Sequence, residues 1–233
     1  MNTIIVTGGT SDIGYETIKK FHTDHDIIFT FSKNIKKARE IEKTFKAKGF
    51  KVNLHDLNSI NNLFKKINKK KIVSLVHIAA EKSERETLDE MKQSKIIKQI
   101  EANCIGTTIL LQKTIKLMKK NQNNNKNIIM ISSQSAKFGG NKISVYSASK
   151  AYLDGLNLSL SKELPGSIKI NNITLGKIAT LGFKKSFKNN KNLTRDIPMK
   201  RLGEPHEVAS TIKLLIKEFT YLTGADIKLT GGR

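Results

Sequence analysis

The sequence predicts one α/β domain, residues 1–233, built as a doubly wound parallel sheet of about seven strands with helices on both faces. Short runs rich in valine and isoleucine alternate with longer segments of helical period, which is the order that such a sheet requires. The apolar runs are nearly continuous, as expected for strands buried on both faces. A length of 233 residues fits one large domain, and no linker interrupts the chain.

Seven segments carry the β-branched, apolar character of buried strands. They are Thr3–Thr7, Ile27–Phe31, Lys51–Leu54, Ile72–His77, Asn127–Ile131, Ile168–Thr174 and Ala225–Leu229. Two of the intervening helices show their buried face directly as apolar residues at helical spacing. These residues are Ile35, Ala38, Ile41 and Phe45 in one helix, and Ile60, Leu63, Phe64 and Ile67 in the next.

The polar stretch 119–127, KKNQNNNKN, runs from a helix into a strand. This position places it at the amino edge of the sheet, opposite the edge where such folds bind ligands. We interpret it as a loop without a ligand.

Composition excludes several classes of protein. Hydrophobic residues make up 38% of the chain and charged residues 27%, so a sizeable core is possible and wholesale disorder is excluded. No apolar run approaches the roughly 18 residues that cross a bilayer, and no charged leader with a longer apolar stretch opens the sequence. The single cysteine, Cys104, excludes an intrachain disulfide and a multi-cysteine zinc cluster. We expect a cytoplasmic protein without membrane association or a metal site.

The charge is strongly basic: 42 basic and 20 acidic residues give a formal net charge of +22 at pH 7. Such a charge would suit a polyanion. Only five of the basic residues are arginine, however, and the 37 lysines are spread along the whole chain. Because nucleic-acid recognition favours the planar guanidinium group, we interpret the charge as mainly compositional and expect no nucleic-acid partner. A dedicated polyanion-binding face is the alternative.

The first expected strand runs directly into a glycine-rich segment, Thr7-Gly8-Gly9-Thr10-Ser11-Asp12-Ile13-Gly14, which precedes a helical pattern. Glycines at such a turn let the backbone approach a pyrophosphate, whose charge the N-terminus of the helix stabilises. The segment therefore predicts a dinucleotide site formed by Gly8, Thr10, Ser11, Asp12, Ile13 and Gly14. Tight packing of the turn without a ligand is the alternative.

Tyr146 and Lys150 are four residues apart, so on a helix they lie on one face. The lysine ammonium is then expected to lower the pKa of the phenol from about 10. Tyr15 and Lys19 have the same spacing, and we interpret that pair as accidental because no strand and serine precede it.

Ser133 follows the strand Asn127–Ile131, where the chain would leave the carboxyl edge of the sheet. A hydroxyl group from this loop would be useful beside Tyr146. Ordinary loop capping by Ser132, Ser133 and Ser135 is the alternative.

In their order along the chain these motifs resemble the short-chain dehydrogenase/reductase family, and the resemblance covers essentially the whole sequence. The glycine-rich turn matches the family's Thr-Gly-x-x-x-Gly-x-Gly, with Asp12 in place of the middle glycine. Asp56-Leu57 matches the aspartate that holds the adenine, and Asn103 matches the helix asparagine. Residues 170–180 are similar to the segment of the family that binds the nicotinamide. Residues 197–209, 221–224 and 231–232 look very like the C-terminal signature of bacterial 3-oxoacyl-(acyl-carrier-protein) reductases.

The resemblance implies a Rossmann-type fold and reversible hydride transfer between a nicotinamide and a carbonyl group or secondary alcohol. It implies four catalytic residues. Tyr146 would protonate the carbonyl oxygen and Ser133 would donate a hydrogen bond to it. Lys150 would lower the phenol pKa and bind the nicotinamide ribose, and Asn103 would hold a helix distortion and a water that relays protons to Lys150. The implied cofactor contacts beyond the turn are Asp56, Leu57, Ala79, Tyr146, Lys150, Gly176, Ile178 and Thr180.

Cofactor preference is expected to depend on the residues after the second strand. An acid there accepts from the ribose 2′-hydroxyl of NAD, whereas basic or hydroxyl groups favour the 2′-phosphate of NADP. The sequence has Phe31-Ser32-Lys33-Asn34 and no acid before Glu40. We therefore expect NADP, with Ser32 and Lys33 facing the 2′-phosphate.

The sequence departs from the family pattern in four places, one of which spans two residues. His77-Ile78 stands where the family has two asparagines, and we expect His77 to be a buried, hydrogen-bonded substitute and not a catalyst. Asp12 would repel a pyrophosphate unless its carboxylate caps the following helix and points away. Leu175 replaces a proline, and Thr230 replaces an aspartate near the C-terminal contribution to subunit contacts.

Residues 181–201 correspond to a small substrate lobe, and they are more basic than the rest of the chain. The lobe carries Lys184, Lys185, Lys188, Lys191, Arg195, Lys200 and Arg201 against Asp196, which is seven basic residues minus one acidic residue, or +6 over 21 residues. Two interpretations stay open. The charge steers an anionic substrate to the site, or the lobe is a solvated loop that is rich in lysine.

We therefore expect an NADP-dependent reductase of a small-molecule or carrier-bound ketone, with 3-oxoacyl thioesters as the nearest analogy. A homodimer or homotetramer is expected through the long helices that contain Asn103 and Tyr146. A reductase of a keto-sugar or another anionic metabolite is the second interpretation. A non-catalytic, nucleotide-sensing regulator on the same fold is the third.

Overall fold

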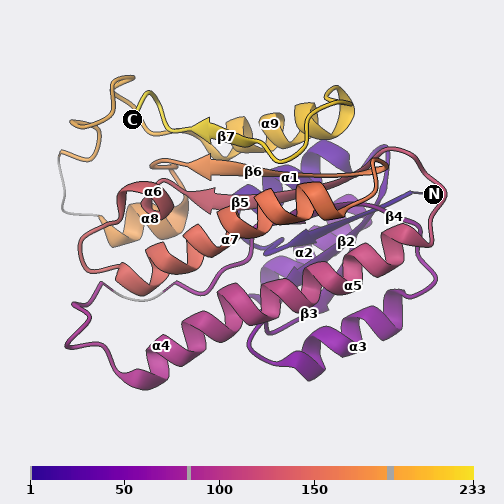
Figure 1. The fold of residues 1–233 in the computed structure, drawn as a ribbon, viewed down its shortest axis with the longest axis horizontal. Helices are drawn as coiled ribbons and strands as arrows, with labels where there is room; N and C mark the ends of the chain where they lie inside the picture. The colour runs from indigo at the N-terminus through magenta and orange to yellow at the C-terminus, as the bar shows by residue number, and fades with distance from the viewer. Residues whose placement is uncertain (1, 83–84, 188–191) are drawn as a thin grey trace.

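The structure is a computed structural model that describes residues 2–82, 85–187 and 192–233 (Figure 1). In this part of the chain a seven-stranded sheet has the order β3-β2-β1-β4-β5-β6-β7, and all neighbouring strands are parallel. The strands are β1 (Thr3–Thr7), β2 (Asp26–Phe31), β3 (Lys48–Lys51), β4 (Ile72–His77), β5 (Lys126–Ser133), β6 (Ile168–Leu175) and β7 (Asp226–Leu229). The predicted doubly wound parallel sheet is confirmed.

The connections between the strands are mostly helical. They contain α1 (Asp12–Phe21), α2 (Ile35–Phe45), α3 (Leu57–Ile67), α4 (Gln93–Ile100), α5 (Thr107–Lys119), α6 (Ser135–Phe138), α7 (Ser144–Glu163), α8 (Leu181–Ser186) and α9 (Pro205–Lys217). A π-helical segment, η1 (Glu101–Gly106), joins α4 to α5 without a break. None of the helices in the described ranges is both long and apolar enough to cross a membrane.

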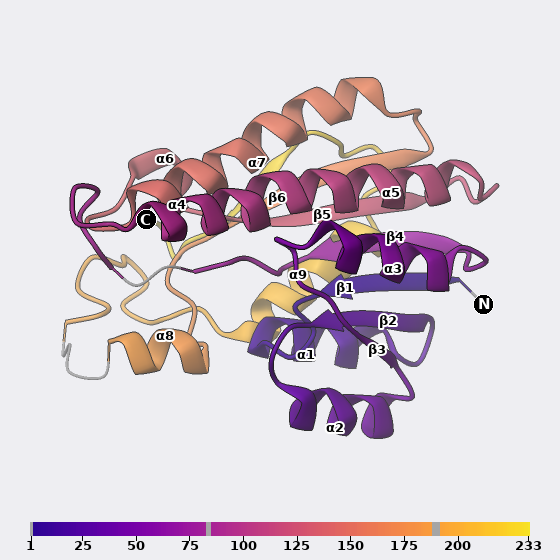
Figure 2. The same cartoon turned by 90° about the horizontal axis from the view of Figure 1, so that it is seen from below.

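Two apolar cores form because the strands carry apolar side chains on both faces. Phe21, Ile41 and Ile212 bring α1, α2 and α9 onto one face. Leu63, Leu110 and Leu153 bring α3, α5 and α7 onto the other. Figure 2 shows the sheet between the layer that holds α5 and α7 and the layer that holds α1 and α2.

The third strand differs from the prediction. It spans Lys48–Lys51 and not Lys51–Leu54, and its last residue pairs with Phe31 of β2. Val52 and Leu54 are buried as predicted, but they enter the core on the α3 side after the chain has left the sheet. The edge strand itself contains one large apolar residue, Phe50, so apolar character does not mark its position.

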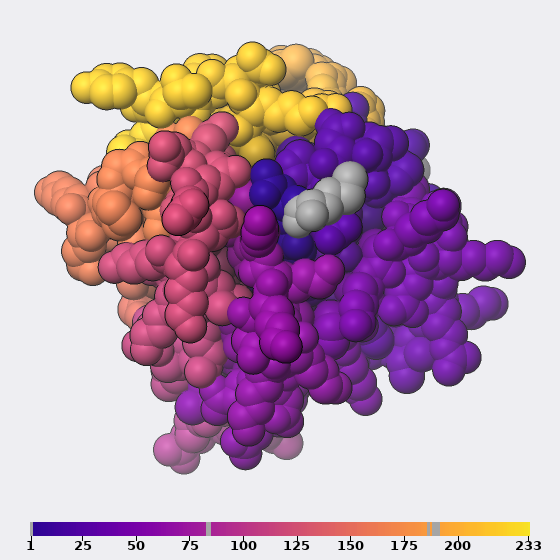
Figure 3. Space-filling view, turned by 90° about the vertical axis from the view of Figure 1, so that its right-hand side faces the viewer, coloured from indigo at the N-terminus to yellow at the C-terminus, as the bar shows by residue number. Residues whose placement is uncertain are grey.

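The polar stretch 119–127 connects α5 to β5 at the amino edge of the sheet. Its asparagine side chains accept hydrogen bonds from nearby backbone N–H groups, as in turns, at Asn121 and Asn123. Figure 3 looks onto this edge and shows the pink segment beside the orange end of α7. The structure thus places this loop on the side away from the site described below.

The carboxyl edge of the sheet holds a switch point between β1 and β4. β1 pairs with β2 on one side and with β4 on the other, so successive connections leave in opposite directions and open a crevice at the ends of these strands. The glycine-rich turn, the loop after β4, Ser133 and the segment after Leu175 all follow strands that end at this edge.

Candidate active site

The glycine-rich turn has the backbone geometry that its sequence requires. Gly8 has a φ of +68°, which favours glycine. A Cβ atom on Gly14 would lie 2.3 Å from the carbonyl oxygen of Gly8, so close packing excludes any side chain there. Ser11 is the N-cap of α1, because its Oγ accepts from Gly14 N at 3.1 Å and donates to Gly8 O at 2.7 Å. Packing thus explains the glycines, and the same turn places the N-terminus of α1 at the ligand-binding edge of the sheet.

Asp12 was expected to repel a pyrophosphate unless its carboxylate capped the following helix and pointed away. It does not cap that helix, because Ser11 already fills this role. Asp12 Oδ2 instead accepts a hydrogen bond of 2.6 Å from the backbone N–H of Leu181, at the start of α8. Its other oxygen lies 3.9 Å from Lys37 Nζ. The carboxylate therefore points toward α8 and Lys37 and not toward its own helix.

His77 is buried and hydrogen-bonded, as predicted from the sequence. Thr7 Oγ1 accepts from the N–H groups of Ile78 and Ala79, at 3.0 and 3.1 Å, so its own proton is donated to His77 Nδ1 at 3.0 Å. The opposite nitrogen, Nε2, then carries the ring proton and donates it to Thr107 Oγ1 at 3.0 Å. Burial lowers the pKa of His77 to about 3, with a smaller contribution from the charge of Lys150, so the ring is neutral near pH 7.

Ser133 and Tyr146 come together at the carboxyl ends of β5 and the start of α7. The Ser133 hydroxyl is close enough to the phenol of Tyr146 to lower the pKa of that group. Ser133 Oγ also accepts from Ser135, from the backbone N–H at 3.2 Å and from the hydroxyl at 3.0 Å. Because these two donors occupy its lone pairs, Ser133 is left to act as a donor. Ser132 points elsewhere and donates to Asp154 at 3.0 Å.

Lys150 is buried one helical turn after Tyr146. Its Nζ donates to Ile131 O at 2.8 Å and lies 5.8 Å from the centre of the Tyr146 ring. Burial and, to a smaller extent, the charge of Lys82 lower the pKa of Lys150 to about 8, while Asp154 opposes the change. The residues expected to act together are therefore adjacent.

The pKa of Tyr146 differs from the sequence-based expectation. Burial raises it to about 12, and the Ser133 hydroxyl only partly opposes this. Lys150 was expected to lower the phenol pKa, but the net change is upward because the effect of burial outweighs that of Ser133. The phenol consequently keeps its proton at neutral pH.

Asn103 lies in the π-helical segment η1, so the helix distortion expected at this residue is present. Its side chain holds the loop after β4: Oδ1 accepts from Glu81 N at 2.7 Å, and Nδ2 donates to Glu81 O at 3.0 Å. Nδ2 also donates to Ser149 Oγ at 3.0 Å, on the residue before Lys150. Asn103 thus joins three elements around the site.

The segment after β6 lies at the same edge. Leu175 continues the strand where a proline was expected from the resemblance, and its carbonyl accepts from Gln134 N at 2.9 Å. Gly176 N donates to Leu229 O at 2.9 Å, and Thr180 is the N-cap of α8, accepting from Phe183 N at 3.1 Å. Gly176 also packs against the backbone of Thr230.

The residues expected at the adenosine end are on the surface. Ser32 and Lys33 are exposed after β2, and Asp56 is the N-cap of α3, accepting from Asn58 N at 2.9 Å. Lys37 was missed by the sequence analysis. It lies one turn into α2, with its ammonium 5.0 Å from the centre of the Tyr15 ring.

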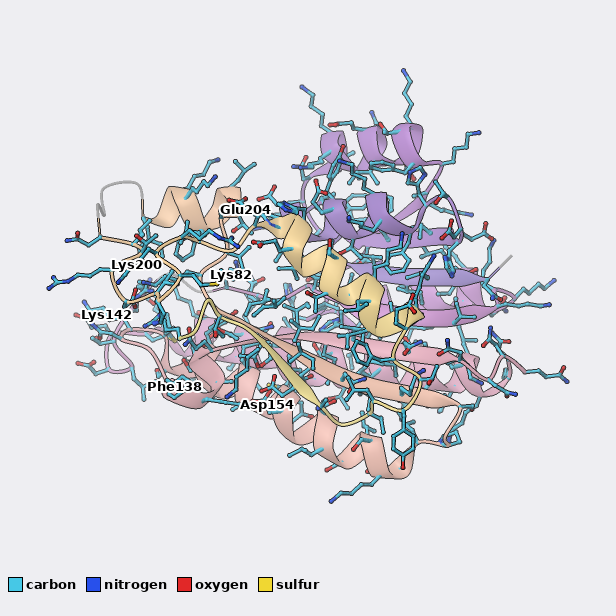
Figure 4. All side chains as sticks on the ribbon, turned by 90° about the horizontal axis from the view of Figure 1, so that it is seen from above. Lys82, Phe138, Lys142, Asp154, Lys200 and Glu204 are labelled. Carbon is cyan, nitrogen blue, oxygen red and sulfur yellow. The ribbon has the colours of Figure 1, made fainter. Side chains whose placement is uncertain are left out.

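Basic groups surround the carboxyl edge. Figure 4 shows Lys82, Lys142 and Lys200 there, on three different loops. Lys82 is close enough to Lys150 for its charge to lower the pKa of that buried lysine. Lys188 and Lys191 of the basic lobe lie outside the described residues. Among the residues that are described, no group of three or more histidine, cysteine, aspartate or glutamate side chains is placed to hold a metal ion.

Comparison with known proteins finds matches along nearly the whole chain. A family model described as enoyl-(acyl-carrier-protein) reductase matches residues 8–233. The chain is 32% identical over 239 residues to 3-oxoacyl-(acyl-carrier-protein) reductase FabG of Buchnera aphidicola, covering 99% of this chain and 96% of that protein. It is 30% identical over 240 residues to the Aquifex aeolicus protein of the same name, covering 98% and 95%.

Solved structures share the fold. A blue fluorescent protein from a metagenomic library, solved in complex with NADPH, superposes with a TM-score of 0.90 at 21% identity and covers 99% of this chain and 97% of its own. A short-chain dehydrogenase of Burkholderia cenocepacia in complex with NADP has a TM-score of 0.88 at 20% identity, with 98% and 96% covered. The matched family model, the two reductases and the arrangement at the carboxyl edge lead to one conclusion: this chain belongs to the short-chain dehydrogenase/reductase family of nicotinamide-dependent oxidoreductases.

Proposed function

We propose that the protein reduces a ketone to a secondary alcohol with NADPH. The observation that carries this proposal is the proximity of the Ser133 hydroxyl to the phenol of Tyr146, beside the buried Lys150, at the ligand-binding edge of the sheet. A phenol and a hydroxyl donor that lie together suit the protonation of an oxygen atom that gains negative charge.

The residues present fit a nicotinamide dinucleotide. The turn between β1 and α1 opens at the N-terminus of a helix, where a pyrophosphate is stabilised. Gly8, Thr10, Ser11, Asp12, Ile13 and Gly14 would surround it, with Asp56, Leu57 and Ala79 toward the adenosine. Gly176, Ile178 and Thr180 would flank the nicotinamide. When bound, the reduced cofactor supplies a hydride to the carbonyl carbon.

Side chains of the protein supply the proton that the carbonyl oxygen receives. Tyr146 holds its proton at neutral pH, since its pKa is raised to about 12, and donates it to the carbonyl oxygen as the C–O bond becomes single. Ser133 donates a hydrogen bond to the same oxygen because Ser135 fills its acceptor sites. Lys150 contributes a positive charge 5.8 Å from the centre of the Tyr146 ring and would donate to the ribose of a bound nicotinamide. Asn103 fixes the loop at Glu81, and the distorted helix around it would hold a water for proton return to Lys150.

NADP is favoured over NAD by the charges after β2. Ser32 and Lys33 are exposed at the end of this strand, and Lys37 lies one turn into α2. A 2′-phosphate placed here would meet a hydroxyl and two ammonium groups, whereas the first acid after the strand is Glu40. Two structural neighbours were solved with NADPH or NADP, which supports the same preference.

For the substrate we propose a 3-oxoacyl thioester, on the strength of the two similar reductases. The basic groups Lys82, Lys142 and Lys200 around the site suit an anionic substrate or carrier, and they suit a keto-sugar phosphate equally (Figure 4). A substrate panel therefore has to contain both classes.

We also propose a homodimer or homotetramer formed through the helices that carry Asn103 and Tyr146. Four large side chains on these helices are exposed: Ile97 and Ile105 are each 48% accessible, Tyr152 is 40% accessible and Leu158 is 58% accessible. Covering them would remove apolar surface from water. Light scattering on the purified protein measures the assembly, and a monomer would contradict the proposal.

The decisive experiment measures NADPH oxidation with acetoacetyl thioesters, keto-sugars and simple diketones, for the unmodified protein and for Tyr146→Phe. Loss of a positioned general acid is expected to lower turnover by about 10²–10⁴-fold while NADPH binding changes little. Tyr15→Phe is the matched control, because Tyr15 packs on Phe45 away from Ser133 and also has a lysine four residues later. Equal activity of the two variants would refute the assignment. NADPH binding without reduction of any ketone would instead favour a nucleotide sensor.

A further inference from the structure

One carboxylate joins two parts of the site that are far apart in the sequence. Asp12 and Leu181 are 169 positions apart, yet Asp12 Oδ2 lies 2.6 Å from the N–H of Leu181. Asp12 is the first residue of α1 and follows the glycine-rich turn, whereas Leu181 is the first residue of α8 and opens the substrate lobe. The hydrogen bond therefore connects the place where a pyrophosphate would bind to the segment beyond the nicotinamide end.

Few apolar contacts hold α8 in place. The helix has six residues, too few to be stable by itself. None of the side chains described in it is buried, and Leu181 is 62% exposed. Thr180 satisfies one of its free N–H groups, and Asp12 satisfies another. Polar contacts thus determine where this helix begins.

The other end of α8 has a second attachment. The ring of Phe187 stacks on Phe183 with 4.6 Å between centres, and the guanidinium of Arg85 lies 5.0 Å from the Phe187 centre. Arg85 belongs to the loop after β4 and donates to Asn141 O at 3.2 Å. The segment from Thr180 to Phe187 is therefore held from the cofactor turn at its start and from the loop after β4 at its end.

We propose that Asp12 is a positioning residue that fastens the substrate lobe to the cofactor turn. Its effect on turnover rests on the proposed ketone reduction, but the fastening itself does not. Since the carboxylate adds a negative charge next to a pyrophosphate site, it weakens cofactor binding while it orders α8. Removal of Asp12 should therefore strengthen cofactor binding and loosen the lobe at the same time. If Asp12 had only a structural role, its removal would loosen the lobe and also weaken cofactor binding.

The test measures backbone amide hydrogen exchange at Leu181–Phe183 and NADPH affinity by fluorescence titration, in the unmodified protein, Asp12→Ala and Asp12→Asn. In Asp12→Ala we expect exchange at these amides to rise about tenfold, NADPH to bind several-fold tighter, and kcat for a ketone to fall. Asp12→Asn keeps an acceptor oxygen without the charge, so it should share the tighter binding and retain most of the amide protection.

Asp24→Ala is the charge-matched control. Asp24 follows the far end of α1 and pairs with Lys217, so its loss should change neither measurement. Arg85→Gln should raise exchange toward Phe187 without changing NADPH affinity. Equal exchange in Asp12→Ala and the unmodified protein would overturn the proposal, and so would a loosened lobe with weaker NADPH binding. Failure of the proposed function would appear separately, because it requires that the unmodified protein oxidise no NADPH with any ketone.

Discussion

Burial changes the pKa of the two central residues in opposite directions. The phenol of Tyr146 is neutral when protonated, so burial raises its pKa to about 12. Lys150 is charged when protonated, so burial lowers its pKa to about 8, and Lys82 adds to the effect. At neutral pH the site therefore holds a protonated acid next to an ammonium that is close to losing its charge.

This combination predicts the pH dependence of reduction. Tyr146 stays protonated across pH 6–10, whereas Lys150 loses its charge as the pH rises through about 8. We expect kcat/KM to be level at lower pH and to fall above an apparent pKa near 8, which a pH profile measures in the free enzyme. Lys82→Gln removes a repelling charge and should move this fall to higher pH. Lys142→Gln is the control, and an identical shift in both variants would contradict the role of Lys82.

Cofactor choice also belongs to single residues. Lys33→Asp places a negative charge where the 2′-phosphate is expected, so NADPH affinity should fall about ten- to hundredfold and approach that for NADH. Fluorescence titration with both cofactors gives the ratio of the affinity for NADPH to that for NADH. Lys43→Asp makes the same charge change in the last turn of α2 and should leave the ratio unaltered. Tighter binding of NADH by the unmodified protein would reverse the assignment of the cofactor.

At the scale of elements, hydrogen bonds through His77 join β1, β4 and the start of α5. Thr7 donates to one ring nitrogen, and the other donates to Thr107, whose hydroxyl lies 3.2 Å from Ala102 O in η1. The π-helical segment that carries Asn103 is therefore linked to the strand that ends in the glycine-rich turn. Two asparagines of the family pattern are absent here, and a neutral histidine makes the connection between strands.

His77→Leu leaves the hydroxyl groups of Thr7 and Thr107 without their partner, which should lower the free energy of unfolding by about 1–3 kcal/mol. Urea denaturation measures the loss. The folded-state pKa of about 3 lies below the usual 6.5, so the unfolded chain binds the extra proton between these values and the native protein loses stability as pH falls through this range. The variant lacks this effect. Its free energy of unfolding should therefore lie furthest below that of the unmodified protein above pH 7, and the difference should shrink in acid. A difference independent of pH would contradict the assigned protonation of His77.

At the scale of the whole molecule, the charge of +22 is spread over the surface, and the carboxyl edge receives part of it from several loops (Figure 4). Steering by such a field acts on encounter and is screened over about 10 Å at 0.1 M salt. If the field guides substrate, its effect must depend on the charge of the substrate. The alternative, a solvated surface rich in lysine, predicts no such dependence.

Salt therefore distinguishes the two interpretations. For a carrier-bound or otherwise anionic substrate, kcat/KM should fall steeply as salt increases, while that for a small neutral ketone should change little. Charge reversal at Lys184 and Lys185 should flatten the salt dependence without changing NADPH affinity. The matched control reverses Lys65 and Lys66 in the last turn of α3. Equal salt slopes for both substrates would leave the lobe lysines without a functional role.

The parallel sheet, the glycine-rich turn and the spacing of Tyr146 and Lys150 were predictable from the sequence because each is a local pattern. Buried strands need continuous apolar runs, a tight turn needs Gly8 and Gly14, and a helix brings residues four apart onto one face. Tertiary structure alone decided what depends on distant neighbours. It gave the Asp12 carboxylate a partner 169 residues away, placed β3 by its pairing with β2, and raised the pKa of Tyr146 through partial burial of the phenol. Hydrogen-bond partners, strand register and burial arise from contacts between segments that no single segment contains.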